Sequence, residues 1–173
     1  MKHKGLPIDP QNWGTLKKNV PGLEAAAKEA QRPHSRLALN IIKEQSSYYE
    51  SMRVLKENGL RPVTYQEVFV ALKRDPKLSE QLKGQWFWLG AIGTSMSGYY
   101  VIKSDGSVKR SSPITFEECV QFTKGTNPLS FGVDKDSGSP ASRSRTRFSI
   151  YAHVDTNVAA PLVVGVPDST VNS

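Results

Sequence analysis

The chain has 173 residues, of which 38% are hydrophobic and 23% are charged, and a mass of 19.1 kDa. This length suits one domain, or one domain with a subdomain, and it is sufficient for a core without disulfides or metals. The 13 glycines and 11 prolines are close to ordinary usage, so collagen-like and wholly disordered chains are excluded. The single cysteine excludes an internal disulfide and any multi-thiolate metal site.

The chain is basic, because 23 Lys and Arg residues face 16 Asp and Glu residues, for a net charge of +7 and a pI near 9.5. Such a charge favours nucleic acid, anionic lipid or acidic partners, but it also suits a merely solvated surface. Residues 1–19 lack the apolar run of a secretory signal, and no stretch of about 18 apolar residues is present. We therefore predict a cytoplasmic protein without a membrane partner.

The N-terminal half favours helices. Residues 1–22 hold three prolines and three glycines without periodicity, which predicts an irregular arm. Strong helix formers at 23–31 predict a helix. The range 35–58 predicts one long helix that ends at Gly59. Its apolar stripe follows a 3.6-residue period through Leu37, Ile41, Tyr48, Met52 and Leu55.

Two further helix starts have local signatures. Thr64 and Glu67 have the spacing of a capping box, in which each side chain accepts from the other's backbone amide. Asp75 followed by Pro76 is typical of a helix with proline at its first position, and Gly84 would end this helix. The sequence therefore predicts two short consecutive helices.

Beyond Gln85 the pattern changes to strands. Residues 86–89 are apolar on both faces of a two-residue period, which predicts a strand covered on both sides. Further strands are predicted at 98–103, 107–110, 128–133, 146–155 and 161–166, with a short helix opened by a second capping box at Thr115. Along 146–155, Phe148 and Ile150 share one face with Ala152 and Val154.

These elements predict an α+β protein with N-terminal helices followed by a small, mainly antiparallel β-sheet and one short inserted helix. The predicted parts are an irregular arm (1–22), a helical subdomain (23–84), a β-rich subdomain (85–167) and a frayed tail (168–173). We expect 23–84 and 85–167 to form one globular unit.

One set of residues could support nucleophilic catalysis. Cys119, His153 and Asp155 are the residue types of a cysteine hydrolase. However, Cys119 lies on the apolar face of its predicted helix, whereas the other two lie on the polar face of a strand, so a core cysteine is the simpler interpretation. No phosphate-binding loop is present, and a His–Asp pair alone does not define a metal site. We therefore predict no catalytic residue, no cofactor and no metal.

A row of arginines suggests a nucleic-acid surface. In an extended strand, Arg143, Arg145 and Arg147 would point the same way at steps of about 6.6 Å, close to the spacing of phosphates along a single strand. Tyr151 and His153 continue this face, and the tyrosine could stack on a base. A serine-rich loop kept soluble by arginines is the alternative interpretation.

The helical half offers a second basic surface around its two short helices. Its candidate residues are Lys73, Arg74, Lys77 and Lys83. Helix, turn, helix and strands in this order resemble a winged helix in outline, but the second helix lacks a base-reading face. The aromatic residues Trp86, Trp88, Tyr99 and Tyr100 are predicted to belong to the core.

Taken from the residues alone, the chain is most simply a non-catalytic binding or structural module with a modest electrostatic affinity for nucleic acid. The alternative is a protein–protein assembly component or homo-oligomer, for which the long amphipathic helix would supply an interface. A small cysteine hydrolase built on Cys119 and His153 is the third hypothesis.

Overall fold

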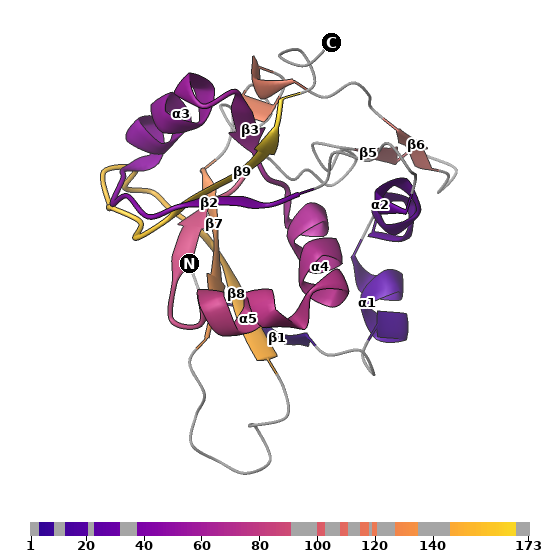
Figure 1. Cartoon of the computed structure of the whole chain (residues 1–173). Helices are drawn as coiled ribbons and strands as arrows, with labels where there is room; N and C mark the ends of the chain where they lie inside the picture. Colours follow the sequence, from indigo (N-terminus) through magenta and orange to yellow (C-terminus); the bar gives the residue numbers. More distant parts are fainter. Residues whose placement is uncertain are drawn as a thin grey trace.

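The computed structural model describes residues 4–8, 13–20, 23–31, 38–90, 100–102, 108–110, 115–117, 119–120, 127–134 and 146–168 (Figure 1). The helices are α1 (Trp13–Asn19), α2 (Leu23–Ala30), α3 (Tyr48–Glu57), α4 (Tyr65–Arg74) and α5 (Pro76–Leu82). The strands are β1 (Lys4–Ile8), β2 (Asn40–Ile42), β3 (Leu60–Pro62), β4 (Trp86–Trp88), β5 (Tyr100–Ile102), β6 (Val108–Arg110), β7 (Leu129–Val133), β8 (Thr146–Ala152) and β9 (Val163–Pro167). The fold is α+β, as predicted.

The helices do not all precede the strands, which corrects the predicted order. β1 and α1 occupy the range predicted to be an irregular arm, and β2 lies inside the range predicted to be one long helix. The helix in that range begins only at Tyr48, after Ser47 caps it by accepting from the Glu50 amide. Ser46, the residue before this cap, forms an isolated antiparallel β-bridge with Ala160. Long-range pairing thus overrides a locally helical pattern here.

The strands form antiparallel pairs in three groups. Sheet A has the order β1-β8-β7-β4, sheet B has the order β2-β9-β3, and β5 pairs with β6. In sheet A, Phe131 lies opposite both Phe87 and Ile150. Neighbouring strands therefore present these apolar residues on the same face.

The local helix signals of the sequence are confirmed. At the start of α4, Thr64 Oγ1 accepts from the Glu67 amide at 3.3 Å, and Glu67 Oε1 accepts from the Thr64 amide at 3.0 Å. Pro76 is the first residue of α5. Gly59, which follows the Asn58 C-cap of α3, has a φ of 69°, a conformation that other residues rarely adopt. Residues 116–117 and 119–120 are helical on either side of Glu118.

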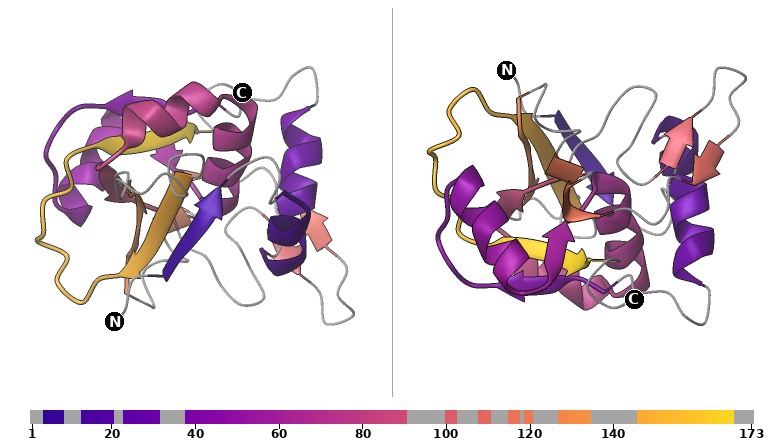
Figure 2. Two further views of the ribbon diagram at one scale, coloured as in Figure 1. Left: turned by 90° about the horizontal axis from the view of Figure 1, so that it is seen from below. Right: turned by 90° about the horizontal axis from the view of Figure 1, so that it is seen from above.

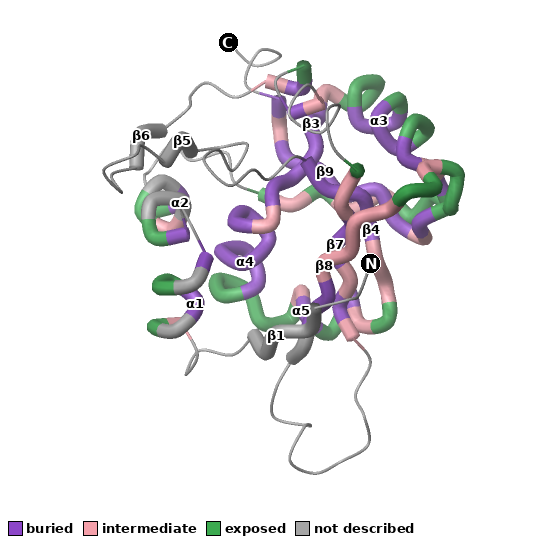
Figure 3. Tube along the Cα trace, turned by 180° about the vertical axis from the view of Figure 1, so that it is seen from behind, coloured by how far each residue is buried: buried purple, intermediate pink, exposed green. Residues whose placement is uncertain are grey.

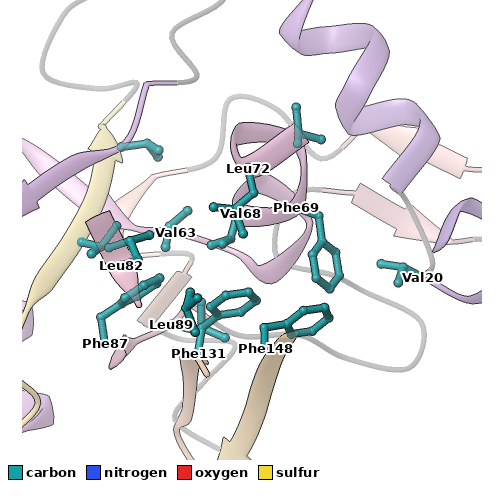
Figure 4. Packing of buried hydrophobic residues seen from close by; sticks show 14 of the residues in the cluster. Val20, Val63, Val68, Phe69, Leu72, Leu82, Phe87, Leu89, Phe131 and Phe148 are labelled. Atoms are coloured by element: carbon teal, nitrogen blue, oxygen red, sulfur yellow. The ribbon is translucent and has the colours of Figure 1, made fainter. Parts of the chain in front are cut away.

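The main core lies between α4 and the inner face of sheet A (Figure 4). The Phe69 ring of α4 packs 4.5 Å from that of Phe148 and 5.9 Å from that of Phe131, measured between ring centroids. Figure 1 shows α4 between sheet A and α2, and α2 packs against α4. Figure 2 shows α1 and α2 together at one side of the molecule, with β5 and β6 beside α2. The inner face of sheet A is therefore covered.

A second core lies between α3 and sheet B and includes Trp88 of β4. The Trp88 ring meets that of Tyr48 edge to face, with centroids 5.5 Å apart, and its Nε1 donates to the Ser46 carbonyl at 3.2 Å. Figure 3 shows α4 and β9 buried along most of their length, while α3 has an exposed side. Across the described residues, no helix has the length and apolarity that a membrane span requires.

Candidate functional site

The outer face of sheet A carries a group of aromatic and polar side chains. The register aligns Trp86 of β4 with Gly132 of β7, and Gly132 with Ser149 of β8. Two residues further along each strand, and therefore on the same face, Ser130 lies opposite Tyr151. Since side chains alternate between the faces of a strand, these residues face away from the buried phenylalanines of the inner face.

These residues line an open pocket of about 360 Å³. Its floor is open at Gly132, which has no side chain between Trp86 and Ser149. Gly84 and Gln85 contribute to its wall just after α5. The pocket is therefore a consequence of strand register combined with one glycine. Its volume is at the lower end of the range usual for small-molecule sites.

His153 is the centre of an aromatic cluster in this pocket. Its ring stacks on that of Trp86, with centroids 5.2 Å apart and planes 13° apart. It meets the rings of Trp88 at 4.4 Å and Tyr151 at 4.6 Å edge to face. Nε2 lies 2.7 Å from Ser130 Oγ. The histidine thus fixes two half-buried rings, Trp86 and Tyr151, at the surface of the sheet.

The opposite side of the pocket is polar. Ser149 Oγ donates to Asp134 Oδ1 at 3.0 Å, just beyond the end of β7. Asp134 is half-buried, and it is the charged residue among those that line the pocket in the described part of the chain. The pocket therefore combines aromatic ring surface with a carboxylate that is held in place by a serine.

The structure brings only some of the predicted nucleic-acid residues together. Tyr151 and His153 lie in the pocket. Arg147 belongs to β8, opposite Pro7, and only its backbone is described. Arg143 and Arg145 lie outside the described residues.

The lysine-rich group lies elsewhere, around α4 and α5. Lys73 Nζ sits 4.5 Å from the centroid of the Trp13 ring, on the inner side of sheet A. Arg74 and Lys77 are exposed near the junction of α4 and α5. Lys83 Nζ pairs with Glu80 at 3.0 Å, and this lysine directly precedes the pocket residues Gly84 and Gln85. Only Lys83 is thus close along the chain to the outer-face pocket.

Cys119 is fully buried, and its thiol lies 3.7 Å from the Pro62 carbonyl oxygen. Asp155 is exposed and accepts from the Asn157 amide in a turn, whereas His153 belongs to the aromatic cluster. The prediction of a core cysteine is confirmed. In the described ranges, no three or more His, Cys, Asp or Glu residues gather as a metal-binding group.

Sequence reasoning missed Trp86, Ser130, Asp134 and Ser149 as pocket residues. The prediction that residues 86–89 are covered on both faces is wrong at Trp86, because its ring is only half-buried and lines the pocket, whereas Trp88 is 1% exposed. The prediction for 146–155 extends too far, since β8 ends at Ala152 and Val154 is 87% exposed. Alternating small residues at 130 and 132, between apolar residues, were the available signal for a solvent-facing side of β7.

The division of range 35–58 into β2 and α3 also interrupts the amphipathic stripe that suggested an assembly interface. Comparison of the chain with family models, with curated proteins and with solved structures detected no match.

Proposed function

We propose that the protein binds single-stranded nucleic acid on the outer face of sheet A, with a base against the aromatic cluster. The observation that supports this most directly is the pocket in which Trp86 and Tyr151 present half-buried rings on a sheet surface. Every base has a π-face, so such a surface binds bases of any sequence, and each stacked base contributes about 1–3 kcal/mol.

The rings are held before any ligand arrives. Stacking of His153 on Trp86 and its contact with Tyr151 restrict both side chains. A restricted ring loses little rotamer entropy when a base stacks on it, so more of the contact energy contributes to affinity. This arrangement would let the cluster bind a base at a small entropic cost.

The charge of the chain supports the same ligand. The net charge of +7 attracts a polyanion. The two-residue period of the sequence predicts that Arg143, Arg145 and Arg147 point the same way and would contact successive phosphates of a bound single strand. A base of that strand would then lie near Tyr151. A duplex is disfavoured, because its paired bases are stacked on one another and cannot reach the pocket.

The experiment is fluorescence anisotropy with a labelled single strand and the matching duplex, at several salt concentrations. We expect tighter binding of the single strand and a linear fall of log K with log salt concentration. Tyr151→Ala is expected to cost about 1–3 kcal/mol of binding free energy, and Tyr151→Phe to restore most of it because the ring is retained.

The matched control is Tyr49→Ala. Tyr49 is 68% exposed on α3, outside the pocket, so its removal should leave the affinity unchanged. Urea unfolding of each variant separates loss of binding from loss of folding. Equal losses in the two alanine variants, or no binding to the single strand at low salt, would overturn the proposal.

A further inference from the structure

We infer that the outer-face pocket selects guanine, because the Asp134 carboxylate can accept two adjacent N–H groups from one edge of that base. This inference rests on the proposed function and adds a base preference to it. It depends on a different observation, namely the polar side of the pocket rather than its aromatic side.

The position of the Asp134 carboxylate is fixed by a hydrogen bond. Ser149 Oγ donates to Oδ1 at 3.0 Å, and in the described part of the chain it is the side-chain partner of this carboxylate. An ionised carboxylate has about four acceptor positions on its two oxygens, so accepting from Ser149 leaves acceptor capacity on both. The carboxylate is thus oriented by the protein and can still accept from a ligand.

The four bases differ in what they present to such a group. Guanine carries a ring N–H beside an exocyclic amino group, so it can donate to both oxygens at once. Adenine and cytosine place a single amino group beside a ring nitrogen that accepts. Uracil and thymine place their N–H between two carbonyl oxygens, which the carboxylate repels. Paired hydrogen bonds to a charged acceptor are the strong ones, so guanine should bind best.

The shape of the pocket suits one planar base. Trp86 and Tyr151 supply ring surface, and Gly132 leaves the floor between Trp86 and Ser149 open. A Cβ atom at position 132 would lie 3.4 Å from the Trp86 Cβ, which is an ordinary contact. A side chain at position 132 would therefore begin without a backbone clash and would occupy the floor of the pocket.

The test uses four labelled RNA strands of eight nucleotides. One is all uridine, and the other three carry a single central guanosine, adenosine or cytidine among uridines. A single guanosine per strand avoids four-stranded association. We expect the guanosine strand to bind about tenfold more tightly than the adenosine strand, the discrimination that one bidentate pair typically gives. The Asp134→Asn variant should reduce this ratio to about one, because an amide cannot accept both N–H groups of the guanine edge.

Two further variants test whether the guanosine preference arises in the pocket or from the net charge of the protein. Asp155→Asn removes an equivalent charge at an exposed turn, so it should keep the guanosine preference. Gly132→Val should abolish the preference by filling the floor, and the urea midpoint should remain near that of the wild-type protein. Loss of preference in Asp155→Asn as well would assign the effect to net charge and overturn the inference.

The two proposals fail in different ways. If all four strands bind equally and Tyr151→Ala still weakens them, the guanine inference is wrong and the proposed function stands. If none of the strands binds at low salt, the proposed function is wrong and the inference falls with it. A preference for guanosine that survives Asp134→Asn would show that another group reads the base.

Discussion

Arg61 of β3 and Glu67 of α4 form a buried ion pair with two parallel hydrogen bonds. Nη1 donates to Oε1 at 3.0 Å and Nη2 donates to Oε2 at 2.7 Å, and the two side chains are 5% and 3% exposed. The same Oε1 accepts from the Thr64 amide, and the same Nη1 donates to the Pro62 carbonyl. The pair therefore links sheet B to the first turn of the helix that covers sheet A.

Removal of one partner of this pair should be costly. Glu67→Ala leaves the Arg61 guanidinium buried without its carboxylate and removes half of the capping box, so we expect a loss of about 3–5 kcal/mol in the free energy of unfolding. The matched control is Glu57→Ala, which breaks the Arg53–Glu57 pair at 3.0 Å, where both side chains are 58% exposed. An exposed pair contributes at most about 1 kcal/mol. Urea denaturation of both variants measures the difference in the free energy of unfolding. Similar losses in the two variants would contradict a stabilising role for the buried Arg61–Glu67 pair.

Gly165 should tolerate no side chain. A Cβ atom at this position in β9 would meet Leu55 Cδ2 and would lie 2.7 Å from the Arg61 carbonyl oxygen. We expect Gly165→Ala to destabilise the protein by about 1–3 kcal/mol, because both neighbours belong to packed elements and cannot withdraw freely. Gly14→Ala is the control, since a Cβ there meets nothing within 4 Å in helix α1. It should stabilise the helix by up to about 1 kcal/mol. Thermal unfolding that ranks the two variants in the reverse order would be inconsistent with this packing.

Alkaline stability should depend on Tyr65. Burial raises the pKa of Tyr65 from 10.0 to about 12. The folded state therefore keeps its phenolic proton where the unfolded chain has lost it, so this contribution to stability is complete below pH 10 and is lost as the pH rises through 12. Tyr65→Phe removes the ionisable group. Urea midpoints measured between pH 9 and 12 should fall less steeply in the variant than in the wild-type protein. Parallel curves would show that Tyr65 does not titrate differently in the two states.

The Cys119 thiol should be unreactive in the native protein. The residue is 0% exposed, and a thiol without solvent access is not available to an alkylating reagent. We expect iodoacetamide to label it only after unfolding in urea, as measured by intact mass. Rapid labelling under native conditions would instead indicate an accessible thiolate and would revive the cysteine hydrolase hypothesis.

The sequence predicts the elements whose signals are local. The capping box of Thr64 and Glu67 spans three residues, so it identifies the start of α4 without knowledge of any partner. β2 has no such signal. Its residue Ile41 pairs with Val164, and only this distant strand turns a segment with helical periodicity into an extended one. β1 depends in the same way on β8.

The candidate site was predictable only in part, for the same reason. Tyr151 and His153 follow from alternation along one strand. Trp86 and Asp134 join them through the register of β4, β7 and β8, which the spacing of residues within each strand does not specify. The different burial of Trp86 and Trp88, two residues apart on one face, arises because Tyr48 packs on Trp88.

The place of β9 in the middle of sheet B affects how the chain folds. β2 and β3 flank β9 but precede it by most of the sequence, so sheet B has a high contact order. Such pairings form slowly, because a long loop must close before any contact compensates for the lost entropy. Until β9 pairs with them, the backbone N–H and C=O groups of β2 and β3 can pair with another chain. Refolding yield should therefore fall as the protein concentration increases.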